Sequence, residues 1–515
     1  MSKISAIDFA NNVEYNRKRL IQHCRDNGLK INENEPLDNV VAINGQINIS
    51  QPVDTFIVEF KDLDGNDFVP PQYVKKGESA VIPEGYPELD SEYLEFVEWA
   101  VSGGDDLTNV ERDILCLPHY QTKYDEMSGQ RPTYLICYFD DGGLSPTLNF
   151  YTATNTYIDW GDGTEPISAT SSKTHTYANA GWYTIKIYGE KYAIGGNTSY
   201  GSFTTATYRY SLRKAYLSEN VYTLPSHMFY NCNSLKYIVI PYNIIESLPM
   251  GFCSNSACLL SVVLPKGITN TVNNREKGHF AGCQTLKNII IPQGLKVIGS
   301  GMFRGCLSLE KISLPNSVKS LADYAFYQCA KMKSINGIEN IENFNNYCLN
   351  GCNCVESINL SDNITNINGS AFAECTKLSS VSIPNTVVSI GEYAFSSTML
   401  KEITIPSSVM TIGTGIFNSC YNLKNVILYQ DFNISGLSFT YSQLSDTCLV
   451  DIANKLKDNS NDTSKTISFG KSFNYLNIKS IYLNEYGERV DEGTDGALSW
   501  LEFVQNKNWT VSFSA

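Results

Sequence analysis

FAGCQTLKNIIIP, at residues 280–292, is the stretch of sequence that decides the fold, because it recurs. Its pattern is F-x-x-C followed by an alternating apolar run and a proline, and it returns at residues 229–241, 303–315 and 372–384. Self-similarity at a fixed period of this length indicates a solenoid of stacked repeats. Nine rungs are predicted, after a degenerate one that starts near Leu212, and they begin at Phe229, Phe252, Phe280, Phe303, Phe326, Leu349, Phe372, Phe395 and Phe417.

Each rung contains a short apolar alternation, which predicts a strand with two inward side chains and one outward residue between them. The inward pairs include Ile289 with Ile291, Ile312 with Leu314, and Val381 with Ile383. The outward residue is Ser313, Asn359, Ser382 or Thr404 in several rungs, so this face is expected to be wet and available. Further apolar pairs predict where the chain turns back across the core, namely Val318 with Leu321, Ile364 with Ile367, and Val387 with Ile390.

Cysteines recur at one position of the repeat. Cys283, Cys306, Cys329, Cys352 and Cys375 are 23 residues apart, Cys232 and Cys420 are in phase, and Thr398 is the exception. A free cysteine is a small buried hydrophobe that suits a tight turn, so a ladder inside the coil is expected. Cys348, Cys352 and Cys354 suggest a metal site as the alternative. No histidine lies near them in the sequence to complete a zinc set, and we predict no metal and no cofactor.

The repeat resembles the BspA-like leucine-rich repeats of bacterial surface proteins, phages of gut bacteria and some protozoa. The resemblance covers roughly 45% of the chain, as a solenoid over residues 205–440. It implies a curved scaffold for contact with proteins or glycans, and not a reaction.

Residues 53–122 look like an internalin-B-type repeat, a small β-grasp-like module. The similarity rests on a strand, an acidic-glycine turn, a second strand, K-G-x-x-A-x-x-P and a tryptophan, in that order. Asp62, Asp64 and Asn66 are alternatively the start of a calcium loop, but Asp67 and Tyr73 stand where such a loop needs glycine and glutamate, so a hairpin turn is predicted. The matching residues are Phe60, Asp64, Gly65, Val74, Gly77, Ala80, Pro83, Phe96, Trp99 and Tyr120.

Residues 132–190 resemble a PKD-like, immunoglobulin-like β-sandwich. The signature is W-G-D-G-T in a turn, followed by H-x-Y-x-x-x-G-x-Y-x-I-x-I in the last strand pair. His175 is expected to pack beside the turn and not to be catalytic, because no recognisable nucleophile motif accompanies it. The residues that carry the match are Trp160, Gly161, Asp162, Gly163, His175, Tyr177, Gly181, Tyr183, Ile185 and Ile187.

The two ends of the chain differ from the rest. Residues 1–50 predict an amphipathic helix and a short second helix, interpreted either as an attachment segment that docks on a partner or as a helix packed on the next module. Residues 441–515 predict helix, strand, helix and strand. They are interpreted as an α/β cap in which Trp500, Phe503 and Trp509 cover the end of the solenoid core.

Composition and motifs exclude several classes of function. A net charge of -14 argues against binding to nucleic acid. The first twenty residues contain no secretory leader, and no stretch is long enough for membrane insertion. No P-loop, G-x-S-x-G, H-E-x-x-H or dinucleotide motif is present, so no catalytic residue is assigned and the chain is predicted not to be an enzyme. A glycan hydrolase is the remote alternative, because paired carboxylates have no fixed spacing.

The sequence therefore predicts a multidomain, mainly β protein that displays adhesive modules. The first hypothesis is a bacteriophage virion protein, a fibre or surface decoration attached to other virion proteins through residues 1–50 and a homotrimer by family analogy. It would contact host-surface glycan or protein through the sandwich and the solenoid. The alternative is a BspA-like adhesin on a bacterial or protozoan cell surface. The candidate contact positions on the solenoid are Tyr237, Lys311 and Thr404.

Overall fold

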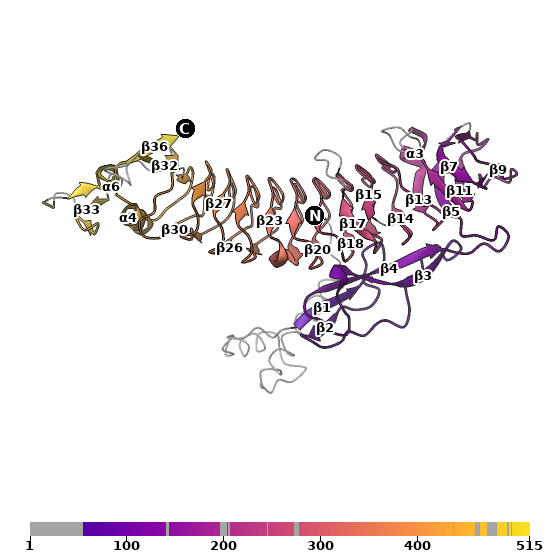
Figure 1. The fold of residues 1–515 in the computed structure, drawn as a ribbon, viewed down its shortest axis with the longest axis horizontal. Coiled ribbons are helices and arrows are strands. Elements are labelled where there is room, and N and C mark those ends of the chain that lie inside the picture. The colour runs from indigo at the N-terminus through magenta and orange to yellow at the C-terminus, as the bar shows by residue number, and fades with distance from the viewer. Residues whose placement is uncertain are drawn as a thin grey trace, which may run out of the picture.

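The computed structural model describes residues 55–140, 144–195, 203, 206–244, 246–271, 278–435, 437–458, 464–470, 481–491, 494–495 and 497–514. Figure 1 shows a long coil with a small region of short strands, the predicted sandwich, at one end and a mixed cap at the other. A separate four-stranded module lies against one side of the coil near the sandwich. The helices predicted within residues 1–50 lie outside the described residues.

The coil is the predicted solenoid, and its rungs carry two parallel strand ladders. Lys311 lies opposite Ser334 in one ladder and Ser320 lies opposite Asn343 in the other, so the 23-residue period is also the register. The first ladder contains β13 (Leu212–Tyr216), β14 (Tyr237–Val239), β16 (Ser261–Val263), β18 (Asn288–Ile290), β20 (Lys311–Ser313), β22 (Ser334–Asn336), β24 (Ser357–Asn359), β26 (Ser380–Ser382), β28 (Glu402–Thr404) and β30 (Asn425–Ile427). The second contains β15 (Glu246–Leu248), β17 (Ile268–Thr271), β19 (Val297–Ile298), β21 (Ser320–Leu321), β23 (Asn343–Phe344), β25 (Asn366–Ile367), β27 (Ser389–Ile390) and β29 (Thr411–Ile412), and a 3-10 turn, η2 (Ile338–Asn340), interrupts one rung.

The predicted inward pairs are buried, and so are Val318, Leu321, Ile364, Ile367, Val387 and Ile390. The phenylalanines form a column of rings along the coil, with centroids 5.3 Å apart for Phe303 and Phe326. The cysteines lie in a second column, as expected, but they are more than small hydrophobes. Each ladder thiol donates to a backbone carbonyl of the preceding rung, such as Cys306 Sγ to Phe280 O at 3.2 Å and Cys329 Sγ to Phe303 O at 3.1 Å. The ladder therefore adds a second hydrogen bond to carbonyls that already accept a backbone N–H, such as Phe280 O from Cys283 and Phe303 O from Cys306.

The first module is a four-stranded sheet with the order β2-β1-β4-β3. Its central strands, β1 (Thr55–Phe60) and β4 (Ile114–Thr122), run parallel, and β2 (Gln72–Lys75) and β3 (Leu94–Val101) pair antiparallel at the two edges. A 3-10 turn, η1 (Ser102–Gly104), follows β3. Trp99 packs edge-on against Phe60 with ring centroids 5.1 Å apart, which places the tryptophan of the predicted pattern in the core of the module.

The sandwich is joined to the solenoid and is not a separate body. Its strand β5 (Thr133–Phe139) pairs with β11 (Gly181–Tyr188) on one side and with β13, the first solenoid strand, on the other. Buried side chains of the sandwich and of the coil form one continuous core, so the sandwich closes the open end of the solenoid. The other elements here are β6 (Thr147–Leu148), β7 (Phe150–Thr154), β8 (Tyr157–Asp159), β9 (Ile167–Ser168), β10 (Lys173–Thr174), β12 (Lys191–Ile194) and α3 (Ala206–Ser211).

The W-G-D-G-T turn has the geometry that its glycines predict. Gly161 has a φ of +74°, and a Cβ there would lie 2.3 Å from the carbonyl oxygen of Thr184. His175 stacks on Trp160 with ring centroids 5.0 Å apart, and its Nε2 lies 2.7 Å from Asp162 Oδ2. The histidine therefore packs beside the turn, as the sequence predicted.

The C-terminal segment continues the phenylalanine column before it closes the coil. The parallel strands β31 (Leu437–Phe439), β32 (Lys465–Gly470) and β36 (Trp509–Ser514) carry Phe439, Phe469 and Phe513 in register. Trp500 and Trp509 are buried and donate to carbonyls of the chain around α4, while Phe503 is half-buried against the same core. The remaining elements are α4 (Asp446–Lys455), β33 (Tyr482–Leu483), β34 (Arg489–Val490), β35 (Leu498–Ser499) and α6 (Trp500–Asn506). None of the described helices has the length and apolar character that a bilayer crossing requires.

Candidate functional site

The outward column of the first strand ladder divides into two halves. In β13, β14, β16 and β18 the outward residues are Tyr216, Val239, Val263 and Ile290, and all four are buried. They pack with Leu117 and Tyr120 of β4 and with other apolar residues of the first module. The expectation that this whole face is wet is therefore wrong for these rungs, because the module covers them.

From β22 to β28 the same column is polar and becomes exposed, whereas Ile427 of β30 is apolar and also exposed. Asn336 is half-buried at the margin of the module, and Asn359, Ser382, Thr404 and Ile427 are exposed. Inward neighbours such as Ile358 and Val381 stay buried, so the strands keep their alternation. Ser313 of β20 is also buried, which corrects its predicted exposure: it lies at the junction and accepts a hydrogen bond from Asn336. From β22 to β28 the open half is therefore a surface of short hydroxyl and amide side chains.

Two carboxylates at the module interface each meet a tyrosine and a lysine of the solenoid. Tyr237 Oη donates to Asp64, and Lys236 Nζ lies 3.3 Å from the same carboxylate. Burial alone would raise the pKa of Asp64, but the hydrogen bonds from Tyr237 and Lys236 outweigh this effect and lower it. The charged form of Asp64 therefore favours docking.

Glu98 repeats this arrangement on the neighbouring edge. Tyr242 Oη donates to its Oε1 over 2.8 Å, and Lys266 Nζ lies 2.6 Å from the same oxygen. Burial would raise the pKa of Glu98, but Lys266 and Tyr242 lower it below its usual range. His119 stacks flat on Tyr242 with ring centroids 3.7 Å apart. Burial lowers the pKa of His119 to about 4, so its ring is uncharged at neutral pH and contributes packing to the interface.

Backbone carbonyls on both sides are also satisfied across the interface. Arg112 Nη1 donates to Leu314 O at 3.1 Å, Gln293 Nε2 donates to Gly103 O at 2.6 Å, and Asn336 Nδ2 donates to Asp113 O at 3.3 Å. These contacts come from different rungs, so the module is fixed in rotation as well as in position.

The three positions proposed from sequence have different outcomes. Tyr237 is buried beneath the module, so its proposed exposure is wrong: the aromatic ring that looked available is part of the docking contact. Lys311 is exposed at the edge of the module, and Thr404 is exposed on the open half. The acidic turn containing Asp62 and Asp64 is a hairpin turn, as predicted. Asp62 accepts hydrogen bonds from Asn66, whereas Asp64 faces the solenoid.

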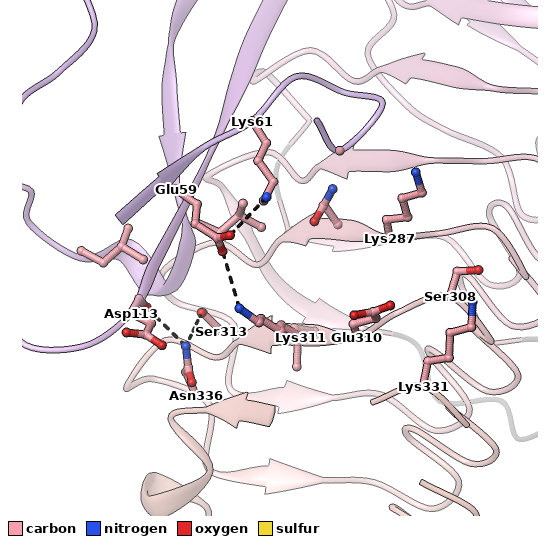
Figure 2. Close-up of a pocket in the computed structure, with 15 residues that line it drawn as sticks. Glu59, Lys61, Asp113, Lys287, Ser308, Glu310, Lys311, Ser313, Lys331 and Asn336 are labelled. Carbon is pink, nitrogen blue, oxygen red and sulfur yellow. Dashed lines mark hydrogen bonds and ion pairs between the residues drawn. The ribbon is translucent and has the colours of Figure 1, made fainter. Parts of the chain in front are cut away.

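A cleft of about 360 Å³ lies where the open half begins, between the module and the rungs of β18, β20 and β22. Figure 2 shows side chains from both walls around it, with Glu59 and Lys61 on the module and Lys287, Lys311 and Lys331 on the solenoid. Of these five residues, only Lys311 was predicted from the sequence as a contact position. The others are distant in sequence, and they come together only because the module docks at this rung.

The cleft carries an excess of cations. Lys61 pairs with Glu59 at 3.1 Å and with Asp67 at 2.6 Å. Burial lowers the pKa of Lys61, but these two carboxylates outweigh it and raise the pKa, so the lysine stays charged. Lys311 lies 3.9 Å from Glu59, a long contact to a carboxylate that Lys61 already engages.

Within the described part of the chain, no three histidine, cysteine, aspartate or glutamate side chains gather as a metal site would require. Cys352 donates to Phe326 O and Cys348 faces Ala371 O, so these two thiols serve different rungs. Cys354 is half-buried beside them. The candidate site therefore consists of the strand face and the cleft.

The repeats match the family model described as BspA type leucine-rich repeat region, with six copies over residues 198–275, 267–371 and 342–468. Together these ranges reach from residue 198 to residue 468, which is more than half of the chain. The chain belongs to the BspA-type leucine-rich repeat family. No curated protein matches the chain significantly.

Three solved structures illustrate what this member of the BspA-type family is similar to. A leucine-rich repeat protein from Bacteroides ovatus is 23% identical, with 52% of this chain and 68% of that chain covered and a TM-score of 0.39. A leucine rich cell surface protein from Faecalibacterium prausnitzii is 18% identical, with coverages of 63% and 91% and a TM-score of 0.31. The pneumococcal vaccine antigen PcpA is 16% identical, with coverages of 64% and 95% and a TM-score of 0.37. The family assignment rests on the repeat match alone.

Proposed function

We propose that this protein is a non-enzymatic, surface-displayed adhesin whose solenoid binds a glycan or protein of a host surface. The observation that carries the proposal is the open half of the strand face, where Asn359, Ser382 and Thr404 point outward from consecutive, rigidly stacked rungs. Hydroxyl and amide groups both donate and accept hydrogen bonds, so such a surface suits ligands rich in hydroxyl or amide groups. Rigid display also keeps the entropic cost of binding low.

Two display settings are proposed. In the first, the chain is a cell-surface adhesin, in keeping with the relative from Faecalibacterium prausnitzii that is described as a cell surface protein. In the second, it is a fibre or decoration on a virion, attached through residues 1–50 and displayed as a trimer. In both settings, many copies on one cell or virion surface convert modest affinity into strong attachment. Fractionation of uninfected cells and mass spectrometry of purified virions separate the two settings.

The first module resembles an internalin-type repeat and the second a PKD-like sandwich. Both resemblances are compatible with a structural role for these modules. The first module has parallel central strands and covers four rungs, while the sandwich extends the solenoid sheet through β5. We propose that both modules hold the solenoid in its display geometry and that the open half makes the ligand contact.

The proposal is tested by incubating the full chain with immobilised panels of host-surface glycans and proteins and measuring both binding and turnover. Saturable binding of at least one panel member without cleavage supports an adhesin. Release of sugar or peptide fragments would instead support the hydrolase alternative. No binding to any member, with the chain folded by circular dichroism, would contradict the proposal.

A further inference from the structure

The cleft at the edge of the first module has the features of a ligand site that the strand face lacks. It is concave, it has a volume of about 360 Å³, and its walls come from two modules that are fixed against each other. Small-ligand sites are typically concave, of this size, and placed at domain junctions. The cleft therefore adds a concave surface beside the outward residues of the open half.

Three lysines in the cleft have incomplete countercharge. Lys331 is exposed and forms no ion pair with any described residue, and Lys287 donates to a backbone carbonyl, that of Asp64, at 3.1 Å. Lys311 has only the 3.9 Å contact to Glu59. Among the acidic lining residues, Glu310 is held by Lys333 at 2.6 Å and Asp113 accepts the backbone N–H of Ile57. Lys287, Lys311 and Lys331 are therefore available for an anion.

The remaining lining supplies hydrogen-bonding groups and aliphatic surface. Ser308, Asn288 and Asn336 contribute hydroxyl and amide groups, and the half-buried Leu115 contributes an aliphatic contact. A pyranose ring has a rim of hydroxyl groups and a C–H face, which matches this mixture. A lone inorganic anion would leave most of these groups unused.

We infer that the cleft binds a carboxylate-bearing sugar unit of an acidic glycan, with the carboxylate attracted by the positive charge of Lys287, Lys311 and Lys331 and the hydroxyl groups at the serine and asparagine side chains. This inference rests on the proposed adhesive function and assigns the ligand class of one part of the binding surface. The carboxylate forms charge-assisted hydrogen bonds with the ammonium groups, which are stronger than neutral ones.

The charge of the whole chain restricts the ligand further. With a net charge of -14, the protein repels extended polyanions, whose charges reach beyond the cleft. At physiological ionic strength, charges farther than about 8 Å away are largely screened. A single carboxylate in the cleft therefore responds mainly to the nearby lysines. The cleft therefore favours a glycan with isolated acidic units over a densely charged polymer.

The test is calorimetric titration of the full chain with methyl glucuronide, with N-acetylneuraminic acid and with methyl glucoside, a neutral match for the first sugar. Saturable binding of at least one acidic sugar is expected, with a Kd of about 1 mM for an isolated unit, and no binding of the glucoside. The methyl ester of the bound acid should lose the affinity, because its carboxylate no longer carries charge.

Lys331→Glu and Lys311→Glu should each weaken this binding by about tenfold or more. Lys401→Glu is the matched control, since it places the same charge change at an exposed position before β28, away from the cleft, and should leave the Kd unchanged. Unaltered melting curves would show that the variants fold. Absence of binding by both acidic sugars, equal binding of the ester, or indifference to the cleft lysines would overturn the inference. So would tighter binding of a diglutamate peptide than of either sugar.

These outcomes are separable from the adhesive function itself. If the cleft variants keep full binding to a panel member while the acidic sugars fail to bind, the inference is wrong and the proposed adhesin stands. If the chain binds no panel member at all, the proposed function fails.

Discussion

The two halves of one strand face differ in a single column of residues. In the covered half the outward residues are Tyr216, Val239, Val263 and Ile290, and in the open half they are Asn359, Ser382 and Thr404. The parallel strand pairing and the buried core continue through both halves, although the period is 27 residues from Ser261 to Asn288 and 23 from Ser357 to Ser380. The solenoid thus uses one architecture for two purposes: the rungs with apolar outward residues from β13 to β18 contact the first module, and the polar ones from β24 to β28 face the solvent.

The change occurs where the first module ends. Ile290 of β18 is buried under the module, Ser313 of β20 is buried at the junction, and Asn359 of β24 is exposed. Polar outward residues under the module would be buried without hydrogen-bond partners. Apolar outward residues beyond the module would form an exposed hydrophobic patch. The boundary of docking is therefore encoded in the repeat itself.

The largest expected effect comes from placing a charge in each half. Ile290→Asp should destabilise the folded chain by about 3–5 kcal/mol, because a carboxylate would be buried without a partner. Ser382→Asp, the same new side chain on an exposed position, should change stability by less than about 0.5 kcal/mol. Thermal unfolding followed by circular dichroism measures both, and equal effects would refute the division into halves.

A smaller effect is expected from the cysteine ladder, which runs beneath both halves without change. Cys283→Ala lies under the covered half and Cys375→Ala under the open half, and each removes a thiol that donates to a carbonyl of the previous rung, at 3.1 and 3.2 Å. Each should cost about 1–2 kcal/mol in denaturant unfolding, since the hydrogen bond of a buried thiol is lost and a small cavity is left. Cys354→Ala, at a half-buried position outside the ladder, is the control and should be nearly neutral.

Thiol labelling tests the same ladder in the native state. Burial raises the pKa of Cys283, Cys329 and Cys375 to about 12, so these thiols should resist iodoacetamide at pH 8 while the exposed Cys258 reacts. Fast labelling of the ladder thiols, read by peptide mass spectrometry, would mean that the rungs open readily.

The smallest effect concerns the docking carboxylates. Asp64 and Glu98 have pKa values below their ordinary values of 3.8 and 4.5 in the docked state, so their contribution is present above these values and is lost as the pH falls through the lowered ones. Because both groups are partly exposed, each should contribute only about 0.5 kcal/mol. The protection factors of amides in β3 and β4, corrected for the intrinsic exchange rate at each pH, should therefore fall modestly as the pH drops below about 4.5. Asp64→Asn with Glu98→Gln should weaken that pH dependence, and an unchanged profile would place the docking energy elsewhere.

The solenoid was predictable because its signal is repeated and local. The period fixed the register, the apolar alternation placed Ile312 and Val381 inward, and the degenerate ends indicated caps. The docking surface was less accessible to the same reasoning, although a signal was present. YIV at β14, SVV at β16 and NII at β18 are apolar at the outward position, whereas SIN, SVS and EIT further along are polar there. Apolar residues on both faces of a strand predict that both faces are covered, although NVI at β30 has the same pattern and its outward Ile427 is exposed.

The cleft could not be predicted, because it depends on a contact between segments that the sequence separates by more than two hundred residues. Glu59 and Lys311 meet only once β1 lies across the rung of β20. Local patterns describe which side chains point outward, but they do not specify which rung a preceding module reaches. Tyr237 shows the same limitation, since an outward tyrosine looks equally suited to a ligand and to a neighbouring module.

The most direct test of the account compares two triple variants on a panel member that the chain binds. Asn359→Arg, Ser382→Arg and Thr404→Arg alter the open half of the strand face, and Asn343→Arg, Asn366→Arg and Thr411→Arg make the same change at exposed positions of the second ladder. Both proteins should fold normally. The first triple should lose binding by at least about tenfold while the second keeps it. Full binding by the first triple, or loss only in the second, would contradict the claim that the open half is the contact surface.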